Sequence, residues 1–333
     1  MKSKKKHFGK NLLLLFSIIL LCLIICELIV RVFIPVRNVG PSFTVYDPVF
    51  GKTNKTDFSA KRFTPEFTMK ISFNSLGFRD PEIESIGNRN IIFLGDSFTL
   101  GYGVNDDEEF PALIRKDFSN DDSVINAGMG DNGNGRWLKF LKTKAEKYNP
   151  ELIVFQIMGN DFDENKIENL FKISSSEELQ ELKVAPPGLA RKVQKIVEFV
   201  PFVPYSYLIG LLRQARIKPS YKPTGAVKDK INVELSYREK LTLKILDECF
   251  SFCQKKEWQM MIILVGISGR KFDVLEDLFA KYDFPIIQIP SKKERPELYY
   301  IIDGHWNKDG HIYTANIISQ NLKQSFPEFY SNP

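Results

Sequence analysis

Short apolar runs alternate with amphipathic stretches from about residue 90 to the end of the chain. The runs are rich in Ile, Val, Leu and Phe, as strands buried on both faces of a sheet are. The predicted strands are 90–94, 123–126, 152–158, 260–265 and 285–289, and the predicted helices are 109–118, 136–148, 233–256, 272–281 and 308–324. Strands that alternate with helices predict an α/β domain in which helices cover both faces of a parallel sheet.

Two segments depart from this alternation. Residues 37–88 are predicted to be an irregular lead-in with short strands, and within them 67–73 alternates between apolar and polar residues as a half-buried strand does. Residues 163–232 contain helical stretches broken by prolines. We interpret them as an insertion that serves as a lid or a substrate-binding element. The main domain is therefore expected to span 89–330, with this insertion inside it.

An apolar run without charges covers residues 12–26 and continues to about residue 36, interrupted only by Glu27 and Arg31. A helix over 12–34 is long enough to cross a hydrocarbon core about 30 Å thick. Because Glu27 and Arg31 are four residues apart, a helix can pair them near the end of the span. The sequence therefore predicts one transmembrane helix at 12–34.

The flanking residues indicate the orientation of this helix. The residues before it include Lys2, Lys4, Lys5, Lys6 and Lys10. Positive charge on this side predicts that residues 1–11 form a cytoplasmic tail and that the rest of the chain is extracytoplasmic. A cleaved signal peptide is the alternative, but the run has no small residues at its exit, and Ile25 before Cys26 makes a poor lipoprotein site. We favour an uncleaved, single-pass anchor in the cell membrane.

Charge and cysteine content exclude some classes of protein. The net charge is +5, and much of it lies in the N-terminal lysines, so the body of the chain is close to neutral. No basic stripe interleaved with aromatic residues is present, which argues against nucleic-acid binding. The four cysteines show neither a disulfide framework nor zinc spacing. Cys249 and Cys253 share a face of a predicted helix, and we interpret them as small buried residues.

Polar residues cluster where functional groups of a parallel sheet gather, at the carboxyl ends of strands. Gly95-Asp96-Ser97 follows the first predicted strand, and Gly159-Asn160-Asp161 follows the third. A third cluster, Asp303-Gly304-His305, precedes the last predicted helix. Serine, histidine and aspartate are the components of a nucleophilic triad, so these clusters predict a serine enzyme.

The scarcity of histidine limits the choice of a base for the serine. The chain has three histidines, and His7 lies on the cytoplasmic side of the predicted anchor, which leaves His305 or His311. Asp303 can orient His305. Ser268, in another turn after a strand, is a rival nucleophile, and Asp303 with the two late histidines is an alternative metal site. We prefer the serine–histidine interpretation, with no metal and no cofactor.

The sequences 95–99 (GDSFT), 159–161 (GND) and 303–307 (DGHWN) resemble, in the same order, the sequence blocks of the SGNH (GDSL-type) hydrolases. The resemblance covers 90–162 and 235–325. It implies a flavodoxin-like three-layer α/β/α sandwich with a parallel sheet, here preceded by a transmembrane helix. It also implies that Ser97 is the nucleophile, His305 the base and Asp303 the partner of the base. The family commonly separates the last two by three residues, whereas here they are two apart.

The same resemblance implies an oxyanion hole with three donors. Ser97 would contribute its backbone N–H and Asn160 its side-chain amide. The family's third donor is a glycine after the second strand, and the loop that follows that strand here offers more than one candidate. We assign the role to Gly130 in preference to Gly128, with Asp131 as a further alternative because a backbone N–H needs no particular side chain.

Together these features predict a membrane-anchored, extracytoplasmic serine esterase, or an O-acyl (acetyl) hydrolase or transferase. The expected substrates are acylated glycans or lipids of the cell surface, because the predicted domain lies outside the cytoplasm. A lid that excludes water would favour transfer over hydrolysis. The alternative function is that of a non-catalytic, glycan-binding module in an envelope assembly.

Overall fold

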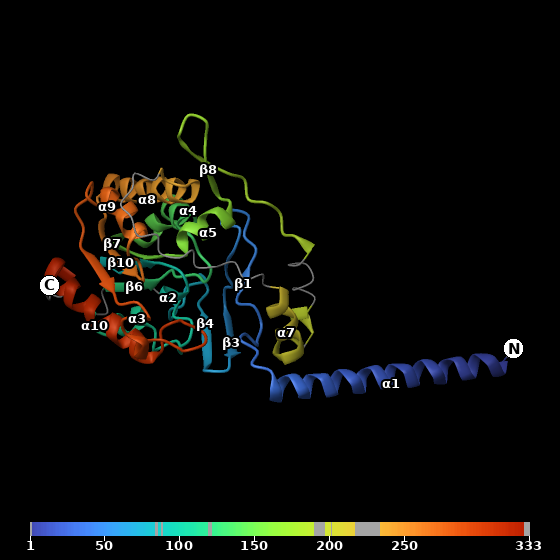
Figure 1. Ribbon diagram of the computed structural model, residues 1–333. Helices are drawn as coiled ribbons and strands as arrows, with labels where there is room; N and C mark the ends of the chain where they lie inside the picture. The colour runs from blue at the N-terminus through green and yellow to red at the C-terminus, as the bar shows by residue number, and fades with distance from the viewer. Residues whose placement is uncertain are drawn as a thin grey trace. The chain divides into compact units, whose positions relative to one another are not determined.

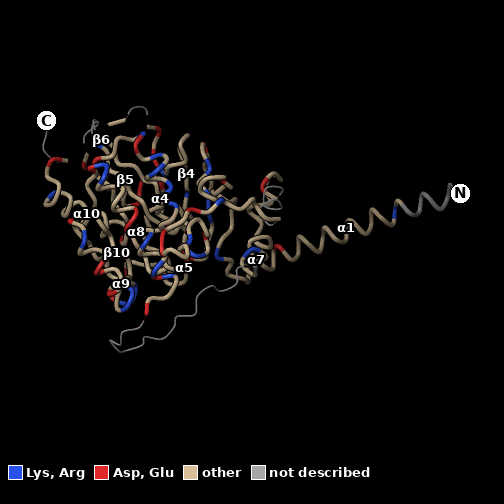
Figure 2. Tube along the Cα trace, turned by 90° about the horizontal axis from the view of Figure 1, so that it is seen from above, with Lys and Arg blue, Asp and Glu red and all other residues tan. Residues whose placement is uncertain are grey.

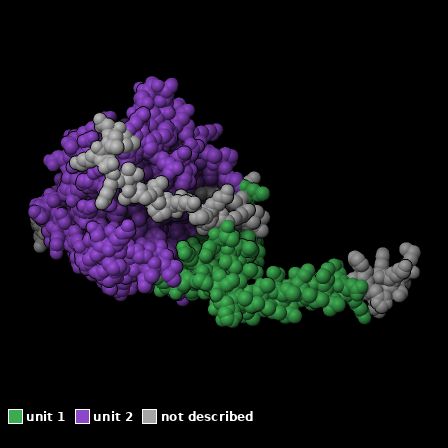
Figure 3. Space-filling view, in the orientation of Figure 1, with its two compact units in different colours: residues 1–42, 62–67, 189–228 green, residues 43–61, 68–188, 229–333 purple. Residues whose placement is uncertain are grey.

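The computed structural model describes residues 2–83, 86–87, 89–118, 122–189, 197–200, 202–216 and 234–329. The chain forms two compact units, which are coloured separately in Figure 3. Unit 1 comprises residues 1–42, 62–67 and 189–228, and unit 2 comprises residues 43–61, 68–188 and 229–333. Of the predicted insertion at 163–232, residues 189–228 belong to unit 1 and the rest to unit 2. Residues 190–196, 201 and 217–232 lie outside the described residues.

The centre of unit 2 is a sheet of five strands whose neighbours all pair in parallel. Its strands are β5 (Arg89–Leu94), β6 (Asp122–Asn126), β7 (Pro150–Met158), β10 (Gln259–Val265) and β11 (Ile286–Ile289). Their order across the sheet is β11-β10-β7-β5-β6. Counted along the chain, this is the 2-1-3-4-5 order of flavodoxin-like folds. The predicted parallel sheet and its five strands are confirmed.

Helices cover both faces of this sheet (Figure 1). One face carries α3 (Phe110–Arg115) and α10 (Lys308–Ser325), and the other carries α4 (Asn134–Thr143), α5 (Asp161–Glu168), α8 (Tyr237–Lys255) and α9 (Arg270–Phe279). Side chains of a strand alternate between faces. Ile91 and Phe93 of β5 accordingly pack in the core with α3 and α10, whereas Ile92 and Leu94 pack in the core on the opposite face. The predicted three-layer sandwich is confirmed.

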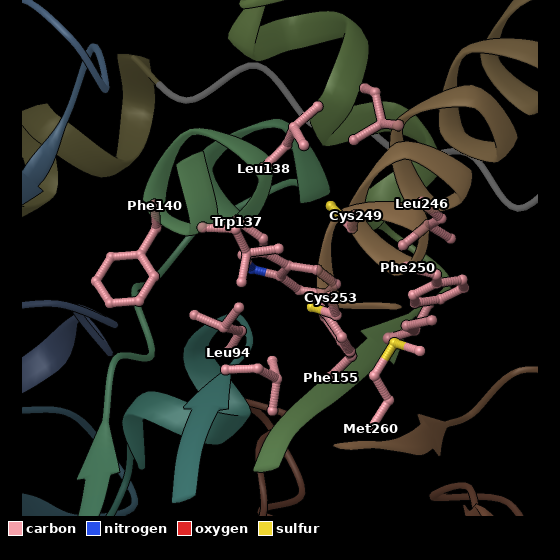
Figure 4. Close-up of a cluster of buried hydrophobic side chains, with 14 of the residues drawn as sticks. Leu94, Trp137, Leu138, Phe140, Phe155, Leu246, Cys249, Phe250, Cys253 and Met260 are labelled. Carbon is pink, nitrogen blue, oxygen red and sulfur yellow. The ribbon is translucent and has the colours of Figure 1, made fainter. Parts of the chain in front are cut away.

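Aromatic side chains fill the larger of the two cores (Figure 4). Phe155 of β7 lies between Trp137 of α4 and Phe250 of α8, with ring centroids 5.9 and 5.3 Å away. Cys249 and Cys253 are buried in the same cluster as free thiols, and burial raises the pKa of both. The interpretation of these cysteines as small core residues is confirmed.

Short strands precede and follow the first half of the sheet. β1 (Thr44–Val45) pairs with β2 (Thr53–Asn54), β3 (Phe58–Phe63) with β4 (Thr68–Phe73), and β8 (Phe171–Ile173) with β9 (Leu179–Glu181). The strand predicted at 67–73 is β4, and its alternate residues Met69, Ile71 and Phe73 are buried. The other elements among the described residues of unit 2 are the one-turn helix α2 (Ser97–Leu100), η1 (Ala145–Tyr148), η3 (Pro296–Leu298) and η4 (Pro327–Phe329).

Unit 1 contains the predicted N-terminal helix. This helix, α1 (Lys2–Phe33), has an apolar stretch at Gly9–Phe33 that is long and apolar enough to cross a membrane, as a signal sequence near an N-terminus also is. Figure 2 shows few charged residues along it, whereas charges of both signs are interspersed over unit 2. The other described helices of unit 1 are η2 (Val203–Tyr205) and α7 (Tyr207–Arg216).

Candidate active site

The first two polar clusters lie at the centre of the sheet. β5 and β7 are neighbours, and the chain leaves them toward opposite edges of the sheet. Ligands of open α/β sheets bind outside the carboxyl ends of strands at such a reversal of strand order. Gly95-Asp96-Ser97 follows β5 directly, and Gly159-Asn160 follows β7. The topology therefore places both clusters at the position where this fold binds ligands.

Close packing around Gly95 determines how the chain turns from β5 into α2. A Cβ atom on Gly95 would lie 2.0 Å from Thr99 Oγ1 and 2.6 Å from Gln156 Oε1, so only glycine fits. Thr99 donates a hydrogen bond to the same Gln156 oxygen at 3.0 Å. The buried Asp96 then caps α2 by accepting a hydrogen bond from the Phe98 N–H at 2.9 Å. These contacts fix Ser97 at the first position of α2.

Replacement of Gly95 with alanine is expected to lower the free energy of unfolding by about 1–3 kcal/mol, because the new methyl group overpacks the Thr99–Gln156 contact. Urea denaturation measures this change. Gly188→Ala is the matched control, since a Cβ there meets nothing within 4 Å. Equal effects of the two substitutions would contradict the assigned role of Gly95.

Arg79 holds the chain just after α2. Its side chain is fully buried and its guanidinium uses five hydrogen bonds. The acceptors are the carbonyls of Leu100 (2.9 Å), Gly101 (2.5 Å), Val104 (2.7 Å) and Lys70 (3.2 Å) and the carboxylate of Asp106 (3.1 Å). A cation at the carbonyl end of a helix is favourable. Arg79 thus fixes the end of the one-turn helix that begins with Ser97, and sequence reasoning missed it.

Ser97, His305 and Asp303 form a chain of hydrogen bonds. His305 Nε2 lies 2.7 Å from Ser97 Oγ, and His305 Nδ1 lies 2.5 Å from Asp303 Oδ1. If Nδ1–H donates to the carboxylate, Nε2 is free to accept the serine proton, as a general base must. The side chains of His305 and Asp303 are only 23% and 15% exposed. The structure brings together the three residues that the sequence analysis assigned to the triad.

The short spacing of Asp303 and His305 is made possible by Gly304. Its φ of +89° lies in the left-handed region, where glycine is favoured. The turn lets the Asp303 carboxylate also accept the His305 backbone N–H, at 3.4 Å. The His305 carbonyl in turn accepts the Tyr300 N–H at 2.8 Å. Asp303 and His305 can therefore form the hydrogen bond that a triad needs although they are only two residues apart.

Aromatic rings hold the imidazole of His305. The ring centroids of Phe98 and Tyr102 each lie 5.0 Å from that of His305. Trp306 is fully buried and contacts Phe98 edge to face at 4.7 Å. The imidazole is thus packed on two sides, which restricts its rotation away from Ser97.

The loop after β6 contains the predicted oxyanion glycine. Gly128 N–H donates to Asn126 Oδ1 at 3.0 Å, and a Cβ on Gly128 would lie 2.4 Å from Leu100 N, so glycine is required there by close packing. Met129 N–H donates to the Gly95 carbonyl. Within the described part of the chain, Gly130 N–H has no hydrogen-bond acceptor. Asp131 follows with a φ of +50°. The geometry favours Gly130 over Gly128 as a donor.

Asn160 is exposed and leads into α5 without capping it. Burial raises the pKa of Asp96, and the Phe98 N–H, the charge of His305 and the side-chain amide of Asn160 oppose part of that rise. The Asn160 side chain therefore lies near the Asp96 carboxylate, next to Ser97.

Lys271 is a further residue at this edge of the sheet that sequence reasoning missed. It lies at the start of α9, and its Nζ donates to the Gly159 carbonyl at 2.5 Å. Burial lowers the pKa of Lys271, and the charges of Asp163 and Asp161 oppose that change. Asp161 is itself fully buried and accepts the Met158 N–H at 3.0 Å. The sequence signal for the contact between Lys271 and the Gly159 carbonyl was only that a lysine follows the turn 266–269 at the end of a strand.

The rival residues do not join the cluster. His311 is buried, its Nδ1 accepts the Phe110 N–H at 3.3 Å, and burial lowers its pKa to about 3. Its role is packing. Ser268 is exposed. The serine that lies within hydrogen-bond distance of His305 is Ser97. Among the described residues, no group of three or more His, Cys, Asp or Glu side chains is arranged to hold a metal ion.

Known proteins were compared with the chain. No protein-family model and no curated protein sequence matches it. Solved structures similar to it include the esterase EstA from Pseudoalteromonas sp., at 13% identity and a TM-score of 0.40 over 72% of this chain and 98% of that one. A two-domain esterase active on acetylated mannans shows 12% identity and a TM-score of 0.39, over 73% of this chain and 51% of that one. A lipase/acylhydrolase from Enterococcus faecalis shows 15% identity and a TM-score of 0.38, over 71% and 96%.

These structural neighbours are esterases and acylhydrolases, and others among the matches are described as GDSL-like. Identities and TM-scores this low do not transfer an activity or a substrate to this chain. Its function has to be inferred from the geometry around Ser97.

Proposed function

We propose that the chain is a membrane-anchored, SGNH-type serine esterase or acyltransferase. The observation that carries this proposal is the hydrogen-bonded chain from Ser97 Oγ through His305 to Asp303. It lies at the carboxyl ends of the strands, at the reversal of strand order. A serine, a histidine within hydrogen-bond distance and a carboxylate on the far side of the ring are the arrangement that activates a serine toward acyl groups.

In this proposal Ser97 Oγ attacks an ester carbonyl while its proton passes to His305 Nε2. Asp303 stabilises the resulting imidazolium. The negative oxygen of the tetrahedral intermediate is bound by the N–H groups of Ser97 and Gly130 and by the Asn160 amide, and loss of one such donor costs about 3–4 kcal/mol in comparable sites. His305 then returns the proton to the leaving alcohol. Water or a sugar hydroxyl takes the acyl group from Ser97, which gives hydrolysis or transfer respectively.

The proposed location follows from α1. Its apolar stretch Gly9–Phe33 would anchor the chain, and the lysines before it would keep the N-terminus in the cytoplasm. Unit 2 would then act outside the cytoplasm, on acyl or O-acetyl groups of cell-surface glycans or lipids. The triad uses no metal or cofactor in this mechanism.

A fluorophosphonate probe tests the proposal, because it reacts with a serine only when a base activates it. The purified protein is expected to become labelled, and Ser97→Ala is expected to abolish labelling. Ser268→Ala, which removes an exposed serine from another strand end, is the matched control and should leave labelling unchanged. Folded protein that takes up no label would instead favour the non-catalytic, glycan-binding alternative.

A further inference from the structure

The carboxylate of Glu27 in α1 is bound by the N-terminal end of α7. Ser206 Oγ donates to it at 2.7 Å, and the backbone N–H groups of Tyr207 and Leu208 donate at 2.9 Å each. Arg31 adds an ion pair at 3.4 Å. The first N–H groups of a helix lack partners within the helix and favour a negative charge. Glu27 supplies both the acceptor and the charge.

Apolar packing reinforces this contact. Val30, Val36 and Val39 form a buried cluster, and the side chains packed against it include Tyr207, Leu208 and Leu211. Gly210 permits the close approach, since a Cβ there would lie 2.8 Å from Val36 Cγ1. The Arg31 guanidinium lies 4.8 Å from the ring centre of Tyr207. α7 is therefore docked on the last turns of α1 by several independent contacts.

The docking has a consequence for the depth of α7. Glu27 lies about 9 Å before the end of α1 at Phe33, given a rise of 1.5 Å per residue. The apolar stretch Gly9–Phe33 is about 37 Å long and exceeds a hydrocarbon core of about 30 Å, so Glu27 belongs near one boundary of that core. Glu27 is hydrogen-bonded to the start of α7, so that end of α7 lies at the same depth.

The same part of unit 1 exposes large apolar side chains. Phe199 is 89% exposed, Phe202 86% and Leu212 59%. α7 contains no acidic residue, and the guanidinium of its Arg213 donates to the Gly40 carbonyl at 3.0 Å. Exposed aromatic and aliphatic side chains are typical of the apolar face of segments that lie in a membrane interface. The apolar stretch of α1 belongs to the same unit.

We propose that residues 197–200 and 202–216, called the interfacial segment, lie in the headgroup region of a phospholipid bilayer and are held there by Glu27. Phe199, Phe202 and Leu212 enter the boundary between headgroups and acyl chains. The proposal rests on the membrane anchoring proposed for α1. It adds a second membrane contact, which fixes unit 1 at the surface rather than leaving α1 as a lone tether.

Spin labels on single cysteines in the full-length protein test the proposal, in vesicles of phosphatidylcholine and phosphatidylglycerol. Cys22 and Cys26 are replaced by serine, and the buried Cys249 and Cys253 by alanine, so that each variant carries one cysteine. Labels at Phe199→Cys, Phe202→Cys and Leu212→Cys are expected to collide more with oxygen than with a water-soluble nickel complex. Labels that prefer the nickel complex at all three positions would overturn the proposal. So would labels shielded from both reagents, which indicate that a protein covers the segment.

Native Cys22 separates this inference from the proposed anchoring. It is exposed in α1, and a label there, with Cys26 replaced, reports whether α1 is in the bilayer. If the label at Cys22 is buried in lipid while those at positions 199, 202 and 212 are exposed to water, only the membrane contact of the interfacial segment is contradicted. If the label at Cys22 is exposed to water, the proposed membrane anchoring of α1 is itself contradicted.

Glu27→Leu tests the docking contact by hydrogen exchange. The amides of Tyr207 and Leu208 lose a charged acceptor, so their exchange is expected to become at least about tenfold faster. Arg31→Leu is the matched control and should change it less than about threefold, because it leaves those hydrogen bonds in place and removes only an exposed ion pair. Labelling of Ser97 by fluorophosphonate should persist in both variants. Unchanged exchange in Glu27→Leu would contradict the docking.

Discussion

Replacement of His305 with alanine is expected to lower kcat for hydrolysis of a short-chain aryl ester by about 10⁴-fold or more, since Ser97 loses its proposed base, which lies 2.7 Å from its oxygen. Steady-state kinetics on the purified protein measures this change. Thermal unfolding is expected to shift modestly, because the Asp303 carboxylate, which is 15% exposed, loses its imidazole partner but keeps the backbone N–H of residue 305.

Residues that act as one catalytic unit are strongly non-additive. The double variant Ser97→Ala/His305→Ala is therefore expected to retain the same residual rate as Ser97→Ala, within about threefold. A His305→Ala protein that keeps a tenth or more of the original rate would show that another group activates the serine. Additive losses in the double variant would show that Ser97 and His305 act separately.

Replacement of Arg79 with methionine is expected to lower the free energy of unfolding by about 3–5 kcal/mol. Methionine fills much of the volume but donates no hydrogen bond, so the buried carbonyls of Leu100, Gly101 and Val104 lose their donor. Urea denaturation followed by circular dichroism measures the change.

Two further variants test whether Arg79 acts through its hydrogen bonds or only by filling space. Arg79→Lys restores the charge without the planar fork, so it should recover part of the stability and less of the activity. Lys70→Met is a control for local charge, since it is the Lys70 backbone carbonyl that Arg79 contacts. A stable Arg79→Met protein with full esterase activity would contradict the role assigned to the guanidinium.

The alternation of apolar runs with amphipathic stretches predicted the sheet, because a strand buried on both faces consists of consecutive apolar residues. The helix expected at 136–148 shows where prediction from this pattern fails. The structure ends α4 at Thr143, and η1 follows up to Asn149, which has a φ of +42°. Amphipathic spacing continues through this break, so periodicity alone could not reveal it.

The hydrogen-bonded cluster of Ser97, His305 and Asp303 was predictable because its residues lie in short segments at strand ends or before the last helix, and because few histidines compete. The groups that support it were not. Arg79 and Lys271 act on backbone carbonyls of Leu100, Gly101 and Gly159, which carry no sequence signature. Gly128 illustrates the same limit, since the sequence cannot distinguish a glycine needed for close packing from one whose N–H is free to donate.

The composition of unit 1 affects how a soluble form of the protein can be produced. A fragment that starts after α1 would retain α7 but lose Glu27 and Val30, which leaves N–H groups at the start of α7 without their acceptor and uncovers Leu208 and Leu211. Such a fragment would tend to aggregate through the uncovered surface. Omission of residues 1–42 together with 189–228 removes both sides of the contact, so a fragment without these residues is the better candidate for crystallisation.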